Sequence, residues 1–278
     1  QPVFNIYGFV RFADEIVDSF HNFDKAKLLE RFKTDTYLAI EEKISLNPIL
    51  NNFQWAVNKY KIERELIEKF LHSMEMDLHD IEYDQPAFEE YILGSAEVVG
   101  LMCLRVFCEG NEARYYELKP SAMRLGSAFQ KINFLRDLKA DYQGLGRSYF
   151  PNIDLKKFDD ETKQKIEDDI AIDFADGLEG IRKLPRGARF GVYMAYVYFY
   201  NLFLKIKRTR SSQIMRERIR IPNRTKYMVF TPSSKVYNWN QSSSASCSNE
   251  ESIFITHTIM LHQYLIWLEC SWQCNIHR

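Results

Sequence analysis

The chain has 278 residues, of which 46% are hydrophobic and 27% charged, and its formal net charge is −1. This composition is typical of a globular protein and excludes a disordered chain. The near-neutral charge argues against a nucleic-acid partner, because binding to phosphate backbones requires a basic excess. The length allows one large domain or two small ones.

Apolar residues recur at helical spacing from the first residues to about residue 230. Start signals predict helices after Asp24 and after Asn47-Pro48, and two more follow at about residues 63–79 and 87–107. We therefore expect an all-α fold in which residues 1–230 form a single helical domain.

In the second half, Lys119-Pro120-Ser121 is expected to open a long central helix that ends near Gly144. An amphipathic helix follows, through Ile166 and Ile181. The apolar, tyrosine-rich run 190–204 is shorter than the ~20 residues that a bilayer requires, so we expect a helix buried on nearly every side or lining an apolar cavity.

We find no signal peptide and no transmembrane helix in the sequence. The chain has five cysteines, and this odd number indicates reduced thiols and a cytoplasmic location. Cys103 and Cys108 lie in an apolar helical run and are expected in the core.

Two predicted helices carry aspartates four residues apart: Asp14 and Asp18 near the start, and Asp137 and Asp141 in the central helix, one turn after Asn133. Residues at this spacing share one helix face, with Cβ atoms ~5–6 Å apart. Carboxylate and amide oxygens suit Mg²⁺, which completes its shell with water and phosphate oxygens. Four carboxylates around one cavity would stay ionised only with cations between them. For either stretch taken separately, a solvated acidic face is the alternative.

Several further residues are candidates for binding an anion or a metal. Arg147 follows two glycines in a flexible turn, and the basic stretch around Arg218 either ends a helix in solvent or reaches back to an anionic ligand. His72, Glu75 and His79 share a helix face, but their order differs from that of zinc proteases, so surface histidines are expected. The surrounding segment MEMDLHD could instead line the mouth of a cavity.

Beyond about residue 230 the sequence becomes serine-rich and then apolar, without helix caps. We expect that residues 231–278 are an atypical tail outside the core fold, and a reading-frame slip near residue 231 is one hypothesis for it. Cys270 and Cys274 in this tail have metal-like spacing but lack a second pair.

Four stretches carry recognisable motifs: DEIVD (Asp14–Asp18), YILGSAEVVG (Tyr91–Gly100), LGSAFQKINFLRDLKAD (Leu125–Asp141) and GRSYFP (Gly146–Pro151). Together, from about residue 4 to residue 228, they resemble the squalene/phytoene synthase family of head-to-head prenyl diphosphate synthases. The resemblance implies a single-domain, all-α isoprenoid-synthase bundle around a central apolar cavity, with the two aspartate helices facing each other at its mouth. Family members carry an additional N-terminal segment with a serine-containing motif, which we expect to be missing from this chain.

The resemblance also implies residue roles. Mg²⁺, or Mn²⁺ in its place, would be held by five residues: Asp14, Asp18, Asn133, Asp137 and Asp141. Tyr91 would lie beside the reacting carbons and, with the four aspartates, complete the catalytic set. The substrate-binding residues would be Tyr7, Arg11, Gln130, Asn133, Arg136, Arg147, Tyr200 and Arg218. Glu97 and Val98 replace a pair that is usually small in the family.

Phytoene synthases are the members that the chain resembles most. This implies condensation of two geranylgeranyl diphosphates to phytoene through a cyclopropylcarbinyl diphosphate, in carotenoid biosynthesis, with Mg²⁺ and without NADPH. The partners implied are prenyl diphosphates and downstream carotenoid enzymes, and the water-insoluble product suggests a peripheral membrane association.

Three alternatives remain open. The first is a squalene or dehydrosqualene synthase that uses farnesyl diphosphate, and the second is a non-catalytic assembly protein of the same family. The third, a head-to-tail prenyltransferase or terpene cyclase, is disfavoured because Ala13 and Glu15 flank Asp14 where an Asp-Asp-x-x-Asp motif would be expected.

Overall fold

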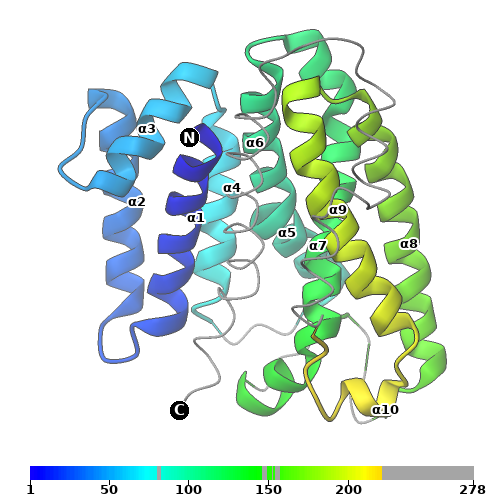
Figure 1. Cartoon of the computed structure of the whole chain (residues 1–278). Coiled ribbons are helices and arrows are strands. Elements are labelled where there is room, and N and C mark those ends of the chain that lie inside the picture. Colours follow the sequence, from blue (N-terminus) through cyan, green and yellow to red (C-terminus); the bar gives the residue numbers. More distant parts are fainter. Residues whose placement is uncertain (80–82, 146–148, 152, 154–156, 221–278) are drawn as a thin grey trace.

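The computed structural model describes residues 1–79, 83–145, 149–151, 153 and 157–220, and for residues 140–145 it describes the backbone. Every long regular element in these residues is a helix, which confirms the predicted all-α class (Figure 1). The elements are α1 (Pro2–Ser19), α2 (Lys25–Glu42), α3 (Pro48–Tyr60), α4 (Arg64–Met76), α5 (Gln85–Ile92), the π-helical turn η1 (Leu93–Glu97), α6 (Val98–Cys108), α7 (Glu112–Leu145), α8 (Asp160–Lys183), α9 (Arg186–Lys207) and α10 (Ser211–Ile214). The predicted tail, residues 231–278, lies outside the described residues.

The capping signals in the sequence start the helices as expected. The side chain of Asp24 accepts a hydrogen bond from the backbone N–H of Lys27 at 3.0 Å. Asn47 and Asp84 cap α3 and α5 in the same way, with donor–acceptor distances of 2.9 Å each. These bonds satisfy backbone donors that the first helical turn leaves free.

The central helix begins earlier than the sequence predicted. α7 starts at Glu112, and Pro120 lies inside it. The prediction that the Lys-Pro-Ser sequence opens this helix was therefore wrong. Asn111 supplies the start signal, because its side chain accepts a hydrogen bond from the backbone N–H of Arg114 at 3.0 Å. An interior proline removes one helical hydrogen bond, and the complete burial of Tyr115 on the additional turns provides packing that offsets this loss.

The helix predicted over residues 87–107 is interrupted by the π-helical turn η1. Two glycines allow close packing around this turn. A Cβ atom on Gly94 would lie 2.5 Å from the backbone oxygen of Lys69 on α4, and one on Gly126 of α7 would lie 3.0 Å from that of Ala96. Larger residues would push α4 and α7 away from η1, so the glycines fix how these three elements meet.

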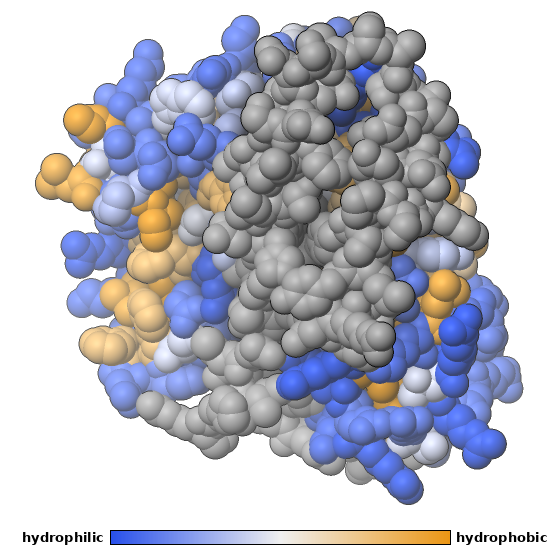
Figure 2. All heavy atoms as spheres, in the orientation of Figure 1, coloured by the Kyte–Doolittle hydropathy of each residue, from blue (hydrophilic) through white to orange (hydrophobic). Residues whose placement is uncertain are grey.

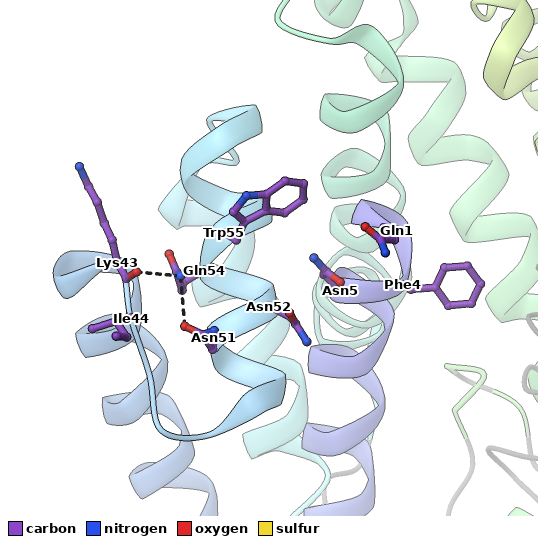
Figure 3. A pocket seen from close by; sticks show the side chains of 9 residues that line it. All are labelled: Gln1, Phe4, Asn5, Lys43, Ile44, Asn51, Asn52, Gln54 and Trp55. Atoms are coloured by element: carbon purple, nitrogen blue, oxygen red, sulfur yellow. Dashed lines mark hydrogen bonds between the residues drawn. The ribbon is translucent and has the colours of Figure 1, made fainter.

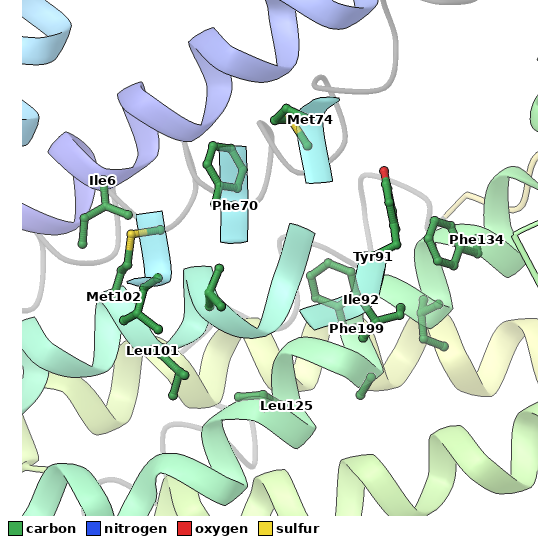
Figure 4. Close-up of a cluster of buried hydrophobic side chains, with 14 of the residues drawn as sticks. Ile6, Phe70, Met74, Tyr91, Ile92, Leu101, Met102, Leu125, Phe134 and Phe199 are labelled. Carbon is green, nitrogen blue, oxygen red and sulfur yellow. The ribbon is translucent and has the colours of Figure 1, made fainter. Parts of the chain in front are cut away.

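The core lies where α1, α4, α6, α7 and α9 meet. Figure 4 shows Ile6 of α1, Phe70 of α4, Met102 of α6 and Leu125 of α7 directed into one apolar cluster. On the α1 side, the rings of Phe9 and Phe53 stack with centroids 3.8 Å apart. This cluster explains why both aspartate helices carry apolar side chains on the face that they turn to the core.

The described residues include one stretch, Gln85–Cys108, that is long and apolar enough to cross a membrane. About half of its most apolar window, 56%, is buried inside the bundle, as is usual for a core helix. Cys103 and Cys108 on this stretch are free thiols, half-buried and buried respectively, as predicted. The cytoplasmic location stays a prediction.

Candidate functional site

An acidic group forms between α1 and the end of α4. Asp14 and Asp18 share one face of α1, and Asp77 ends α4 close enough to act electrostatically on Asp14. Burial, and next the repulsion from Asp18, raise the pKa of Asp14 well above its usual range. Arg11 opposes this shift through an ion pair of 2.5 Å between its Nη1 and Oδ2 of Asp14, and it also pairs with Glu15.

Tyr91 connects this acidic group to α7. Its buried hydroxyl donates a hydrogen bond to Oδ2 of Asp77 at 2.9 Å, and burial, followed by the charge of Asp77, raises the pKa of Tyr91 well above its usual range. Its ring lies 5.4 Å from those of Tyr83 and Tyr149 and 6.0 Å from that of Phe134 on α7, measured between centroids. Figure 4 shows Tyr91 and Phe134 on the same side of the cluster. Aromatic rings therefore surround Tyr91, and the hydrogen bond to Asp77 fixes its hydroxyl group.

The sequence analysis did not select Asp77 as a site residue. The segment MEMDLHD, which was considered as a possible cavity mouth, contains it, and an isolated aspartate at a helix end carries no periodic signal. Only the fold brings it between α1 and α5.

A charged group forms where Arg218, which follows α10, meets Arg136 and Asp137 of α7. The carboxylate of Asp137 is held between two guanidinium groups: Nη2 of Arg136 lies 2.6 Å from its Oδ2, and Nε of Arg218 lies 2.5 Å from its Oδ1. Asp137 and Arg136 are each 3% exposed. Burial lowers the pKa of Arg218, and the nearby Asp137 raises it again in part. Arg218 therefore does not end a helix in solvent, because it reaches Asp137 inside the bundle; its contact with an anionic ligand stays a prediction.

Asn133 lies one turn before Asp137 and is 6% exposed. Its Oδ1 atom is buried and has no hydrogen-bond partner within the described part of the chain. Buried acceptors are almost always satisfied, so this oxygen is suited to a ligand such as a cation.

The remaining predicted site residues are placed as follows. Tyr7 and Gln130 are half-buried, on α1 and α7. Tyr200 on α9 packs its ring against Phe174 at 5.4 Å and Tyr196 at 5.6 Å, so it belongs to an aromatic group between α8 and α9. Asp141 lies in the last turns of α7, where the backbone is described, and Arg147 lies outside the described residues.

A second charged group, which the sequence did not indicate, joins α7 to α8. Asp173 is fully buried and accepts hydrogen bonds from Ser127 at 3.0 Å, Lys131 at 2.7 Å and Arg124 at 3.1 Å. Glu97 on η1 lies near this group, and burial, with the charge of Asp173 next, raises its pKa to about 7. Arg124 and Lys131 thus oppose this rise only in part.

Metal sites outside the aspartate helices find no support in the described residues. His72 faces Glu75 and Glu90, at 3.4 Å in each case, and it is exposed, as predicted for a surface histidine. No three histidine, cysteine or acidic side chains gather around a common point in the part of the chain that the structure describes. Cys270 and Cys274 lie outside it.

A pocket of about 730 Å³ opens between the start of α1 and α3 (Figure 3). Polar side chains of Gln1, Asn5, Asn51 and Asn52 line much of it, together with Trp55. It contains none of the predicted site residues, and it lies at the opposite end of α1 from Asp14.

Comparison with solved structures identifies the class of fold. A dehydrosqualene synthase aligns with a TM-score of 0.72 at 19% identity, covering 87% of each chain. A squalene synthase from Alicyclobacillus acidocaldarius aligns with a TM-score of 0.60 at 18% identity, covering 83% of this chain and 84% of the other. At these identities the likeness establishes the fold, a helical isoprenoid-synthase bundle.

The family follows from the sequence comparisons. The model of the family described as squalene/phytoene synthase matches residues 1–225. The chain belongs to this family, whose members are prenyltransferases, and the predicted resemblance is confirmed.

Two curated relatives are similar to part of the chain. The chain is 30% identical over 164 residues to the presqualene diphosphate synthase of Rhodopseudomonas palustris. This alignment covers 56% of the chain and 55% of the relative. It is 24% identical over 177 residues to the 4,4'-diapophytoene synthase of Staphylococcus haemolyticus, and this alignment covers 61% of the chain and 59% of the relative. The chain thus spans little more than half the length of the curated relatives that it matches.

Proposed function

We propose that the chain joins two farnesyl diphosphates head to head to form presqualene diphosphate, a cyclopropylcarbinyl diphosphate. The proposal is supported by the match to the squalene/phytoene synthase family over residues 1–225 and by the buried hydrogen bond of Tyr91 to Asp77, the carboxylate that acts on Asp14. Presqualene diphosphate and 4,4'-diapophytoene synthases among the relatives favour the C15 substrate over the C20 substrate that the sequence analysis put first.

The residues proposed to hold Mg²⁺ are Asp14, Asp18, Asn133, Asp137 and Asp141. The unpartnered buried oxygen of Asn133 supports their fit to a hard cation. When bound, Mg²⁺ supplies Lewis-acid stabilisation of the charge on a departing diphosphate.

The arginines complement this charge. Arg136 and Arg218 both contact Asp137, and guanidinium groups bind phosphate oxygens in bidentate geometry. We propose that they hold the diphosphate while the allylic carbon–oxygen bond breaks and its electron pair leaves with the diphosphate.

Tyr91 and its aromatic neighbours act on the hydrocarbon part of the substrate. Their rings exclude water from the allylic cation, and each ring face can stabilise positive charge by roughly 0.5–2 kcal/mol. The double bond of the second substrate then attacks the cation, and loss of one proton closes the cyclopropane. This stage consumes no reductant, so we propose no NADPH requirement for it.

The test is incubation of the purified chain with farnesyl or geranylgeranyl diphosphate and Mg²⁺, with mass analysis of the diphosphate and hydrocarbon products. We expect a C30 cyclopropylcarbinyl diphosphate from farnesyl diphosphate. This product should be lost in Asp14→Asn and retained in Asp24→Asn, since Asp24 caps α2 on the outer surface.

A C40 product alone would restore the phytoene assignment and, with it, the predicted link to carotenoid enzymes. Absence of any product, together with no thermal stabilisation by Mg²⁺ and a non-hydrolysable diphosphate, would favour the non-catalytic assembly protein.

A further inference from the structure

Asp77 carries its charge at a place that is unfavourable for a carboxylate. Most charged side chains belong to a hydrophilic surface such as Figure 2 shows, where water solvates them. Asp77 is half-buried instead, and it ends α4, where the backbone carbonyls form the negative pole of the helix. The last turn of α4 contains no basic residue, and the charge of Asp77 acts on Asp14. Residues that oppose the local helix preference in this way are frequent at functional sites.

Tyr91 is held both at its backbone and at its hydroxyl. The hydroxyl donates to Oδ2 of Asp77 at 2.9 Å, and Oγ of Ser95 donates to the backbone carbonyl of Tyr91 at 2.7 Å. The π-helical turn η1 begins two residues after Tyr91, and such turns are frequent at functional sites. Because Tyr91 is only 3% exposed, removal of the acceptor on Asp77 would leave its hydroxyl buried without this hydrogen bond.

Close backbone packing brings the end of α4 to Tyr91. A Cβ atom on Gly94, in the turn that follows Tyr91, would lie 2.8 Å from the Cβ of Ser73 on α4. The backbone carbonyl of Ser73 in turn accepts a hydrogen bond from the backbone N–H of Asp77 at 3.3 Å. Since only glycine permits this approach, the fold itself sets the separation between Asp77 and Tyr91.

We propose that Asp77 is a positioning residue, whose carboxylate fixes the orientation of the Tyr91 ring in the site. The inference rests on the proposed function, in which Tyr91 stabilises an allylic cation. A cation gains most from an aromatic ring when it lies over the face of the ring. An acceptor that prevents the ring from tilting therefore favours formation of the cation, while other residues bind the diphosphate. Loss of Asp77 should thus slow turnover and leave substrate affinity nearly unchanged.

The first test compares Asp77→Ala with Asp77→Asn in steady-state kinetics with farnesyl diphosphate and Mg²⁺. Asp77→Ala should lower kcat at least about tenfold with KM changed by less than about twofold, because the ring loses its orientation. Asp77→Asn keeps an acceptor oxygen at the same place and should retain at least about a third of kcat. Its melting temperature should equal or exceed that of the unchanged chain, because a charge leaves the negative pole of α4.

The second test asks whether Asp77 acts through Tyr91. In the Tyr91→Phe background the hydroxyl is gone, so Asp77→Ala should change kcat by less than about a further twofold. The matched control is Glu75→Gln, which removes another half-buried carboxylate from the end of α4. Glu75 pairs with Lys33 at 2.7 Å, on a different side of the helix end, and this variant should keep the kcat of the unchanged chain.

A readout without turnover is the ¹⁹F NMR signal of 3-fluorotyrosine in place of Tyr91. This signal should shift and broaden in Asp77→Ala, because the ring is no longer held in one orientation, and it should keep its position in Glu75→Gln. If the unchanged chain forms no product from farnesyl diphosphate, the proposed function fails, whereas the fluorine signal still decides whether Asp77 fixes the ring.

Three results would overturn the proposal. The first is a fluorine signal that Asp77→Ala leaves unchanged. The second is multiplication of the two effects on kcat in the Tyr91→Phe/Asp77→Ala chain, since Asp77 would then act independently of Tyr91. The third is an Asp77→Asn chain as slow as Asp77→Ala, because an acceptor at this position would then not be sufficient; a raised Mg²⁺ requirement in that chain would make Asp77 a metal ligand instead.

Discussion

Replacement of Glu97 by glutamine should stabilise the protein, and more so at alkaline pH. The pKa of Glu97 is raised from 4.5 to about 7, by burial first and by Asp173 second, while Arg124 and Lys131 act in the opposite direction. The folded protein therefore binds a proton at this site between pH 4.5 and 7 that the unfolded chain has released. The free energy of unfolding consequently falls as the pH rises through this interval.

The full interval corresponds to about 3.4 kcal/mol, at about 1.36 kcal/mol for each tenfold change in proton affinity. Because the Glu97 side chain is only partly buried, solvent screens this effect, and we expect about 1–2 kcal/mol. Glutamine keeps the shape and removes the charge. Glu97→Gln should thus raise the melting temperature at pH 8 by about 2–6 °C, and at pH 5 by about a quarter of that amount.

The assay is thermal and urea unfolding of both proteins, followed by circular dichroism at pH 5 and pH 8. If Glu97→Gln were less stable than the unchanged chain at pH 8, Glu97 would be an ionised partner of Arg124 or Lys131, and the reasoning would be refuted. An equal gain at both pH values would mean that the effect comes from packing and not from charge.

Four further predictions follow from the site and its support. Asp137→Asn should abolish turnover and also lower stability by about 3 kcal/mol, because two buried arginines lose their anion; a product assay and urea unfolding check both effects. Tyr91→Phe should lower stability by about 1 kcal/mol, since Asp77 loses a hydrogen-bond donor, and should reduce turnover more than substrate binding, which kinetics at varied substrate concentration would show. Gly94→Ala should cost about 1–3 kcal/mol although alanine favours helices, because its Cβ would lie 2.5 Å from a backbone oxygen of α4; a gain in melting temperature would contradict the close packing. Asp24→Asn should leave turnover and melting temperature nearly unchanged, because asparagine caps a helix as well as aspartate does; a large loss of activity would mean that the charge of Asp24 takes part in the site.

Much of the helical framework could be predicted from the sequence because its signals are local. The caps Asp24, Asn47 and Asp84 each accept a hydrogen bond from a backbone N–H two or three residues away. The identity of a few neighbouring residues is therefore enough to predict where these helices begin. The start of α7 was mispredicted because Pro120 is a common first-turn residue, and the packing of Tyr115 that overrides this preference involves residues distant in sequence.

The candidate site also has features that local sequence predicts and features that depend on how the helices pack. The spacing of Asp14 and Asp18, and of Asn133 and Asp137, follows from the helical repeat, so the sequence itself places each pair on one helix face. The hydrogen bond from Tyr91 to Asp77 and the ion pair of Arg218 with Asp137 join residues 14 and 81 positions apart, across different elements. No periodicity encodes such pairs, because they depend on how the helices are packed.

The sequence by itself determined the helical class, the family and the two aspartate faces, because each depends on residues within a few turns of one helix. The tertiary structure decided what those faces meet: an additional carboxylate at Asp77 and a cation from Arg218. It also decided that burial, with Asp173 nearby, raises the pKa of Glu97. It also decided that Leu46 lies outside the core, since burial depends on which neighbours the fold supplies and not on the hydrophobicity of the residue.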